Sequence, residues 1–410
     1  MKISVIGLGK LGLCTAVCCA RAGFETWGMD LKKDYVALIK NGEIPFYESE
    51  LEENLLKYRE NLHLTTDISE AVAKSDISLL IVPTPSQEDG AFSNEYLINA
   101  LKSMGPTLAA KKTFHVVDIV STVMPGSCDN IFKPLLEKIT GKKVAEEIGL
   151  AYNPEFIAIG SVLKNFLNPD LLLIGESDPQ TGQALEEMYS AVCDNSPHVG
   201  RTSLINAEIA KLSINCYCTM KISFANNLAS ICEKVAGADA GDITEIIGHD
   251  SRIGGKYILP GLGFGGPCFP RDNEAFINFT RQAGGFSGLQ QAVVDINNAQ
   301  PGIVTDKIIS LSPENGTVAL LGQAYKPQTY LTERSQALEI ALKLSEHRGL
   351  KVKVYDPLAK EHGPWETCQS LAECVTGADV AAILTPWPEF FDTSWHRLLC
   401  KGATVLNLWK

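Results

Sequence analysis

A glycine-rich loop, Gly261-Leu-Gly-Phe-Gly-Gly-Pro-Cys-Phe-Pro-Arg-Asp272, carries one cysteine directly before a predicted helix. Its four glycines let the backbone approach a ligand closely. Pro270 suits the first helical position, where its missing N–H would be unpaired anyway. The partial positive charge of a helix N-terminus favours a thiolate, and Arg271 adds to it. Cys268 is therefore a candidate nucleophile; the alternative is a packed thiol under a glycine loop.

Most of the other cysteines lack such a setting. Apolar, helix-patterned runs contain Cys14, Cys18, Cys19, Cys216 and Cys218, which we interpret as small buried hydrophobic residues. The twelve cysteines show no regular CxxC spacing, and no HxxxH pattern accompanies them, so we expect no zinc site and no metal requirement. Because the N-terminus runs directly into a predicted strand, we expect no signal peptide, reduced thiols and a cytoplasmic location.

A second group of polar residues lies in a long helical pattern from about Ser203 to Val235, which contains no glycine or proline. Glu208, Lys211 and Asn215 share one face of that helix. Apolar residues surround Lys211 and Asn215, and a partly desolvated lysine can act as an acid or base near neutral pH. The alternative is a solvated polar stripe, which is credible for Glu208. A long unbroken helix is also a natural contact between subunits.

The elements that position these residues begin with a predicted strand, Lys2 to Ile6. It is followed by Gly7-Leu-Gly9-Lys-Leu11-Gly12 and a helical pattern through Ala22. This is the dinucleotide fingerprint: Gly7 makes the turn, Gly9 admits the pyrophosphate and Gly12 lets the helix pack on the strand. The next strand, Glu25 to Met29, ends at Asp30. Its carboxylate is placed to bind a ribose 2′-hydroxyl and to repel a 2′-phosphate, which favours NAD over NADP.

Three further apolar runs, Ile77 to Val82, Phe114 to Val120 and Gly149 to Ala151, indicate strands buried on both faces. Each run is followed by small polar residues. In a doubly wound sheet, ligands bind at the carboxyl ends of the strands. Thr84, Thr122 and Glu155 are therefore candidate site residues; the alternative is ordinary turn chemistry.

A second alternation of strands and helices follows a helix and loop at Pro301 to Asn315. We expect strands at Val318 to Gly322, Lys351 to Val354, Val380 to Leu384 and Thr404 to Leu406, with a helix over Gln336 to His347. Without a full glycine fingerprint, this half is interpreted as a nucleotide fold used for another ligand. The predicted class is α/β, with two Rossmann-like doubly wound parallel-sheet domains joined by a central helical domain with a long helix. We place the domains at 1–198, 199–300 and 301–410.

Composition limits the partners of the chain. Its 410 residues, 45% hydrophobic and 20% charged, are typical of a globular protein with two or three domains. The formal net charge of −12 argues against binding nucleic acid or a membrane surface, since both favour basic patches. No apolar run reaches the length of a membrane span.

With these motifs placed, the chain resembles the UDP-glucose/GDP-mannose dehydrogenase family. The resemblance extends over nearly the full length and is carried by ordered motifs: Gly7-Leu-Gly-Lys-Leu-Gly12, Ser121-Thr-Val-Met-Pro125, Asn153-Pro-Glu-Phe156, Ala207-Glu-Ile-Ala-Lys211 with Asn215, Asp250-Ser-Arg-Ile-Gly254, Gly265-Gly-Pro-Cys-Phe-Pro-Arg-Asp272 and Leu321-Gly-Gln-Ala-Tyr-Lys326-Pro. The family combines an N-terminal NAD-binding domain, a helical centre that dimerises and a C-terminal domain that helps bind a nucleotide sugar.

The resemblance implies oxidation of a sugar C6 alcohol to a carboxylate with two NAD+, through a thiohemiacetal and a thioester on Cys268. The catalytic residues it implies are Cys268, Lys211, Asn215, Asp272, Glu155 and Thr122. With the fingerprint, the cofactor-binding residues are Gly7, Gly9, Leu11, Gly12, Asp30, Thr84, Thr122 and Lys326. The substrate-binding residues it implies are Glu155, Phe156, Lys211, Asn215, Arg252, Tyr257, Gly265, Cys268 and Lys326. The expected assembly is a homodimer, with Arg252 near the neighbouring subunit's site.

The chain departs from the family pattern at four places. Ile159 replaces a second glutamate, Leu171 replaces an arginine, Pro267 replaces the serine before the cysteine, and Glu333-Arg334-Ser335 stands where many members have Arg-Glu-Ser. These changes loosen the assignment of the sugar more than that of the reaction.

Alternative functions remain open at this stage. UDP-glucose is the first choice of substrate, followed by UDP-N-acetylhexosamine, dTDP-glucose and GDP-mannose. A two-electron dehydrogenase of the 3-hydroxyacid or 6-phosphogluconate type shares the Rossmann domain and the lysine and asparagine, yet has no use for Cys268 or a second α/β domain. A catalytically silent binding module for NAD or a nucleotide sugar is a third reading.

Overall fold

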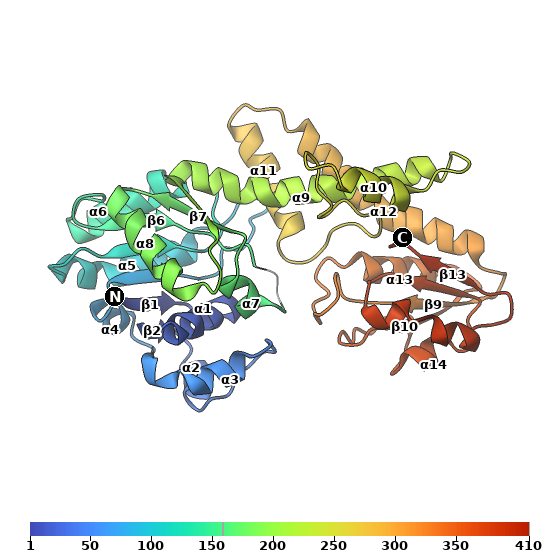
Figure 1. Cartoon of the computed structure of the whole chain (residues 1–410), viewed down its shortest axis with the longest axis horizontal. Coiled ribbons are helices and arrows are strands. Elements are labelled where there is room, and N and C mark those ends of the chain that lie inside the picture. The colour runs from blue at the N-terminus through green and yellow to red at the C-terminus, as the bar shows by residue number, and fades with distance from the viewer. Residues whose placement is uncertain (158–159, 410) are drawn as a thin grey trace. The chain divides into compact units, whose positions relative to one another are not determined.

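The computed structural model describes residues 1–157 and 160–409. The chain divides into two compact units, Met1–Lys211 and Leu212–Lys410, each of which contains a sheet covered by helices (Figure 1). The departure at Ile159 lies outside the described residues.

The first unit contains an eight-stranded sheet in the order β3-β2-β1-β4-β5-β6-β7-β8. Its strands are β1 (Lys2–Ile6), β2 (Glu25–Met29), β3 (Leu62–Thr65), β4 (Ile77–Leu80), β5 (Val116–Ile119), β6 (Gly149–Tyr152), β7 (Leu171–Glu176) and β8 (His198–Ser203). β1, β4, β5 and β6 lie in the middle and are almost wholly apolar, because helices cover both of their faces.

Helices of the first unit form two layers, one on each face of this sheet. They are α1 (Lys10–Arg21), α2 (Lys33–Lys40), α3 (Leu51–Lys57), η1 (Arg59–Asn61), α4 (Ile68–Ala73), α5 (Glu95–Ala110), η2 (Cys128–Phe132), α6 (Lys133–Thr140), α7 (Val162–Leu167) and α8 (Pro179–Val192). One core packs α1, α3, α7 and α8 against the sheet. The other core packs α4, α5, η2 and α6 against the opposite face. The expected doubly wound arrangement is confirmed.

One pair of strands departs from the predicted parallel arrangement. β7 runs antiparallel to β6, with Ala151 opposite Glu176 and Tyr152 opposite Gly175. β8 then pairs with β7 in parallel. The first sheet is therefore parallel over β1 to β6 and mixed beyond. The direction of a strand depends on the connection that leads into it. The apolar pattern within a strand is the same for parallel and antiparallel pairing, so the sequence of β6 or β7 does not predict this direction.

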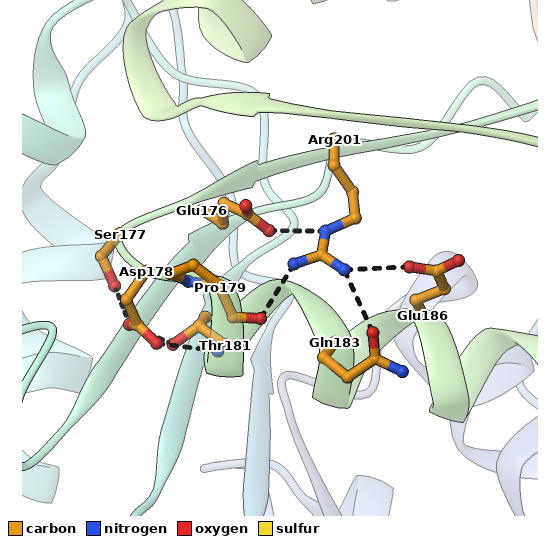
Figure 2. A network of polar contacts seen from close by, with 8 residues as sticks. All are labelled: Glu176, Ser177, Asp178, Pro179, Thr181, Gln183, Glu186 and Arg201. Atoms are coloured by element: carbon orange, nitrogen blue, oxygen red, sulfur yellow. Dashed lines mark hydrogen bonds and ion pairs between the residues drawn. The ribbon is translucent and has the colours of Figure 1, made fainter.

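β8 was not expected as a strand, because its sequence His-Val-Gly-Arg-Thr-Ser is polar. A side-chain network holds it at the sheet edge (Figure 2). Arg201 of β8 contacts Glu176 of β7 at 2.8 Å and Glu186 of α8 at 3.1 Å, and it also donates to the carbonyl oxygen of Pro179. Asp178 caps the same helix by accepting the N–H of Thr181. Polar contacts thus replace the apolar pattern that marks the central strands.

The long helix α9 (Leu204–Cys232) confirms the pattern predicted from about Ser203 to Val235. It is followed by α10 (Ala240–Gly248), α11 (Phe269–Gln282) and α12 (Gly288–Leu311). The helix expected from Pro301 begins earlier, at Gly288, and Pro301 lies inside α12.

The second sheet has the order β11-β10-β9-β12-β13, and all of its pairs are parallel. Its strands are β9 (Thr317–Leu321), β10 (Lys351–Tyr355), β11 (Glu366–Thr367), β12 (Val380–Ile383) and β13 (Thr404–Asn407). Its helical segments are α13 (Gln336–Glu346), α14 (Leu371–Val375), η3 (Pro388–Phe391) and η4 (Thr393–Leu398). The four strands and the helix predicted for this half are confirmed within a few residues. No helix among the described residues is long and apolar enough to cross a membrane.

Candidate functional site

The fingerprint loop between β1 and α1 has the geometry its glycines predict. Gly7 has a φ of +98°, and a Cβ there would overlap the carbonyl oxygen of Ile81. A Cβ on Gly12 would overlap the carbonyl oxygen of Gly7. Gly9 is the N-cap of α1, and a Cβ built on it would meet no atom within 4 Å. No side chain among the described residues caps this helix. These features fit the close approach of a dinucleotide pyrophosphate to the helix N-terminus.

Asp30 follows β2 and already holds the fingerprint loop. Its carboxylate accepts the N–H groups of Leu8 and Lys32, each at 3.0 Å. The side chain is only partly buried, so it stays within reach of a ribose. Leu11 is also partly buried and packs against the core beneath α1.

Loops at the carboxyl ends of β4 and β5 are tied to each other. The hydroxyl of Ser121 accepts the N–H of Val82 at 2.9 Å and donates to the carbonyl oxygen of Val82 at 2.7 Å. Thr84, which is 5% exposed, donates through its hydroxyl to the carbonyl oxygen of Thr122 at 2.7 Å. The structure therefore brings Thr84 and Thr122 together.

The loop after β6 is held by Lys211. Its Nζ donates to the carbonyl oxygen of Glu155 and lies 4.5 Å from the ring centroid of Phe156, a cation–π contact. Lys211 is 6% exposed, so the desolvation predicted for it is confirmed. Burial raises the pKa of Glu155 to about 7, although the charge of Lys211 and the hydroxyl of Tyr189 lower it.

The structure overturns the interpretation of Glu208 as part of a solvated polar stripe. Its side chain is fully buried, and its carboxylate accepts the N–H of Gly126 at 2.6 Å and that of Cys128 at 2.8 Å. Burial raises its pKa, and these two N–H groups lower it. The contact joins α9 to the segment that follows Thr122.

Cys268 lies at the N-cap of α11, as the sequence predicts, and its side chain is exposed. Pro270 occupies the second helical position rather than the first, because the helix begins at Phe269. Of the cysteines interpreted as packed hydrophobic residues, Cys14, Cys18, Cys19 and Cys216 are buried, and Cys218 is half-buried.

Amide side chains from three helices hold the glycine-rich loop. The N–H of Phe264 donates to Asn297 of α12 at 2.7 Å, and the N–H of Gly263 donates to Gln336 of α13 at 2.7 Å. The N–H of Gly261 donates to Asn226 of α9 at 2.9 Å, while Gln300 donates to the carbonyl oxygen of Gly261. Sequence reasoning missed these four amides, although buried Asn and Gln within helices are a signal that could have found them.

Asn215 and Asp272 are brought together in the second unit. The amide of Asn215 donates to Oδ2 of Asp272 at 2.6 Å, and Asp272 is 2% exposed. Arg271 Nε lies 4.0 Å from Oδ1 of the same carboxylate. Lys211 and Asn215 are one turn apart in α9 and therefore share a face of that helix.

Tyr325, which the sequence analysis missed, lies under the loop that carries Cys268. A Cβ on Gly266, whose φ is +80°, would overlap the Tyr325 ring. Burial and, to a lesser extent, the charges of Cys268 and Glu333 raise the pKa of Tyr325 to about 12. Gly265 is equally restricted, because a Cβ there would overlap the carbonyl oxygen of Arg334. Lys326 follows Tyr325 and is partly buried.

Arg252 and Tyr257 lie on the surface of the second unit. The Arg252 side chain is 86% exposed and pairs with Asp250 at 2.7 Å. Tyr257 has a φ of +67° and contacts the ring of Phe269 edge-on at 6.0 Å between centroids. Arg334, from the shifted Glu333-Arg334-Ser335 segment, pairs with Glu274 of α11 at 2.7 Å.

Asp118 is a buried acid that the sequence analysis did not single out. It lies in the middle of β5 and is fully buried, and neither of its carboxyl oxygens meets a hydrogen-bond donor among the described residues. Burial raises the pKa of Asp118 well above its ordinary value, and the charge of Glu155 raises it further. An acid within an apolar strand run was the available signal.

One group of potential metal ligands occurs in the described part of the chain. Ligand atoms of Glu366, Cys368 and Glu373 lie within 4.8 Å of one another. Both carboxylates have other partners, since Glu366 pairs with Lys351 at 3.0 Å and Glu373 accepts the N–H of Gln369 at 2.6 Å. This group lies outside the sites described above.

A dinucleotide fingerprint on one sheet, a second sheet that lacks it and an exposed cysteine at a helix N-cap together define an NAD-dependent dehydrogenase with an additional Rossmann-like domain. Residues 1–193, 205–299 and 319–409 match the NAD binding, central and UDP binding domains of the UDP-glucose/GDP-mannose dehydrogenase family. The chain belongs to this family of NAD-dependent nucleotide-sugar dehydrogenases.

Individual relatives are similar over nearly the whole chain. A UDP-glucose 6-dehydrogenase of Haloferax volcanii is 35% identical, covering 99% of this chain and 97% of the relative. A GDP-mannose 6-dehydrogenase of Pseudomonas syringae is 32% identical, covering 88% and 83%. The solved structure of a UDP-glucose dehydrogenase from Pyrobaculum islandicum has a TM-score of 0.89 at 30% identity, covering 100% and 94%.

Proposed function

We propose that this protein oxidises the C6 hydroxyl of UDP-glucose to the carboxylate of UDP-glucuronate, using two NAD+ in turn. The observation that carries the proposal is Cys268, an exposed thiol at a helix N-cap in a glycine-rich loop. A two-electron oxidation of an alcohol needs no such nucleophile, whereas oxidation of an aldehyde to an acid by hydride transfer needs an adduct from which a hydride can leave.

In the first stage, the C6 alcohol becomes an aldehyde. When bound, NAD+ supplies the hydride acceptor. The hydroxyl proton passes through water to Glu155, whose pKa of about 7 suits a base at neutral pH. Thr122, fixed through its carbonyl oxygen by Thr84, positions that water. Lys211 stabilises the alkoxide that develops as the proton leaves.

In the second stage, Cys268 adds to the aldehyde. A C–S bond forms, the thiol proton passes to Asp272, and the aldehyde oxygen becomes the oxyanion of a thiohemiacetal. A second bound NAD+ would accept the hydride of this adduct, which would leave a thioester on Cys268. Water then attacks the thioester carbon and the C–S bond breaks. The departing sulfur takes back the proton held by Asp272, and the carboxylate is released while the protons of the water pass to solvent. Asn215 donates to the oxyanion of each tetrahedral adduct and also orients Asp272.

We propose that Phe156, Tyr257, Gly265 and Lys326 contact the nucleotide sugar, with Glu155, Lys211, Asn215 and Cys268 at its C6 end. UDP-N-acetylhexosamine, dTDP-glucose and GDP-mannose are the alternative substrates, and the relative named GDP-mannose 6-dehydrogenase keeps the last of these open.

We further propose a homodimer built on α9. Tyr217, Phe224 and Ile231 recur at seven-residue intervals along this helix and are at least half exposed. Such a stripe is typical of a helix that packs on a partner. Arg252 would then lie near the partner's substrate. The domain division at 1–198, 199–300 and 301–410 and the cytoplasmic location stay predictions.

The test is the number of NADH molecules formed per molecule of limiting substrate, measured over a panel of nucleotide sugars. We expect two NADH with UDP-glucose, and loss of complete turnover in Cys268→Ser. One NADH per substrate, or a Cys268→Ser variant as active as the wild type, would favour the two-electron hydroxyacid dehydrogenase instead. Tight ligand binding without turnover would favour a silent binding module.

A further inference from the structure

Glu208 is a fully buried carboxylate to which the proposed reaction gives no part. Each of its oxygens accepts one backbone N–H, from Gly126 at 2.6 Å and from Cys128 at 2.8 Å. Cys128 is the first residue of the helical segment formed by η2 and α6, where backbone donors lack partners within the helix, and Gly126 directly precedes the N-cap residue Ser127. A carboxylate at such a position is stabilised by the donors and by the helix dipole.

The segment that Glu208 holds is the one that carries Thr122. At its other end, Ser121 is fixed by two hydrogen bonds to Val82, and the carbonyl oxygen of Thr122 accepts the Thr84 hydroxyl. Thr122 therefore lies between two anchors. One anchor comes from the loop after β4, which is close in the sheet, and the other comes from Glu208 of α9, which is 82 residues from Gly126 in sequence.

Lys211 lies one turn after Glu208 on the same face of α9 and holds the next loop. It donates to the carbonyl oxygen of Glu155 and covers the ring of Phe156. The two loops follow neighbouring parallel strands, in which Ile119 is opposite Tyr152. A single turn of α9 thus fixes the loop after β5 through an acceptor and the loop after β6 through a donor.

We propose that Glu208 is a positioning residue that holds the Thr122 loop and Lys211 at a fixed separation. The inference rests on the proposed function, which gives Thr122 and Lys211 their roles. A glutamine at position 208 accepts through only one oxygen and directs its NH2 group at a backbone N–H. One anchor of the loop is then lost, and a misplacement of about 1 Å can lower kcat by about 100-fold.

The experiment compares Glu208→Gln and Glu208→Asp with a matched control, Asp178→Asn. Asp178 also accepts backbone N–H at a helix start, that of Thr181 in α8, but it lies after β7, which runs antiparallel to β6. Asp178 therefore lies at the end of the strands opposite to the end that carries the Thr122 loop. We expect all three variants to melt at a lower temperature than the wild type.

The readout that separates positioning from mere stability is kcat against KM. We expect kcat of Glu208→Gln to fall about 100-fold with KM for NAD+ changed less than about threefold. Asp178→Asn should keep kcat within about twofold. Glu208→Asp keeps the negative charge, but its side chain is one methylene shorter, so its kcat should also fall. If Glu208→Gln does not fold, the kcat of Glu208→Asp is the test. Full kcat in a folded, less stable Glu208 variant would overturn the proposal.

A second readout is independent of turnover. The rate at which a small acylating reagent modifies Lys211, followed by peptide mass spectrometry, reports how firmly its amine is held. We expect faster modification in both Glu208 variants and an unchanged rate in Asp178→Asn. If the wild type turns over no nucleotide sugar, the proposed function fails, while the Lys211 rate still tests the anchor; an unchanged rate in the Glu208 variants would then overturn it.

Discussion

Asn215 donates from its side-chain amide to Oδ2 of Asp272 at 2.6 Å, which connects α9 to the first turn of α11, four residues after Cys268. Asp272→Asn keeps an acceptor for Asn215 and removes only the basic oxygen. We therefore expect a melting temperature close to that of the wild type and a kcat lower by about 10²- to 10⁴-fold. An unchanged kcat would remove Asp272 from the reaction.

Glu155 is expected to set the pH dependence of the first oxidation. Burial raises its pKa to about 7, so it is protonated and unable to accept a proton below that pH. The rate of NADH formation should rise as pH increases through 7 and level off above it. In Glu155→Gln that limb of the profile should vanish, with a kcat about 100-fold lower at pH 8. A Glu155→Gln profile identical to that of the wild type would contradict the role of Glu155 as the base.

Asp118 is expected to weaken the fold at neutral pH. Because burial raises its pKa well above the ordinary value of 3.8, folding disfavours its ionised form. Its protonated form is tolerated at low pH, and stability is lost as pH rises above the pKa of the unfolded chain. Asp118→Val should therefore raise the free energy of unfolding at pH 7 by about 1–3 kcal/mol. The gain should shrink toward pH 4 in denaturant titrations; a gain that is the same at both pH values would refute this cause.

Asp30 and Asp356 directly follow corresponding strands of the two sheets, β2 and β10, but they differ in the hydrogen bonds that their carboxylates accept. Asp356 is 1% exposed and accepts the N–H groups of Gln323, Ala324, Leu358 and Ala359 together with the indole of Trp387. We expect Asp356→Asn to destabilise the protein by about 3–5 kcal/mol, because an amide cannot satisfy donors on both of its sides. Among the residues that the structure describes, the Asp30 carboxylate accepts the N–H groups of Leu8 and Lys32.

For Asp30→Asn we expect a smaller loss of stability and a larger effect on the cofactor. The KM for NAD+ should rise about tenfold and discrimination against NADP+ should weaken, since the charge that repels a 2′-phosphate is gone. Thermal melting and cofactor kinetics of the two variants, measured side by side, check the contrast. A loss of stability in Asp30→Asn as large as that in Asp356→Asn would show that both acids serve the fold alone.

The proposed dimer predicts complementation between two inactive variants. Cys268→Ser lacks the nucleophile, and Arg252→Ala lacks the arginine that serves the neighbouring site. When the two are mixed and allowed to exchange subunits, one site in each mixed dimer has both residues, so activity should return. Light scattering checks the assembly at the same time. A mixture that exchanges subunits and stays inactive would place Arg252 in its own subunit's site or outside the site altogether.

Sequence alone was enough for the features that depend on a short stretch of chain. The glycines from Gly7 to Gly12 are sufficient to predict the turn between β1 and α1. Cys268 lies directly before α11 because Pro270 and the residues around it favour the start of a helix. The central strands of both sheets and the long helix could be predicted because apolar runs and helical periodicity are local patterns.

Tertiary structure decided what depends on residues far apart in the chain. Glu208 fits a solvated stripe when only its neighbours in sequence are considered, and it is buried because the N–H groups of Gly126 and Cys128 meet it from 80 residues away or more. The direction of β7, the isolation of Asp118 and the four amides that hold the glycine-rich loop are of the same kind. A buried polar group is stable only when hydrogen-bond partners reach it, and the residues next to it in sequence do not show which distant segment supplies those partners.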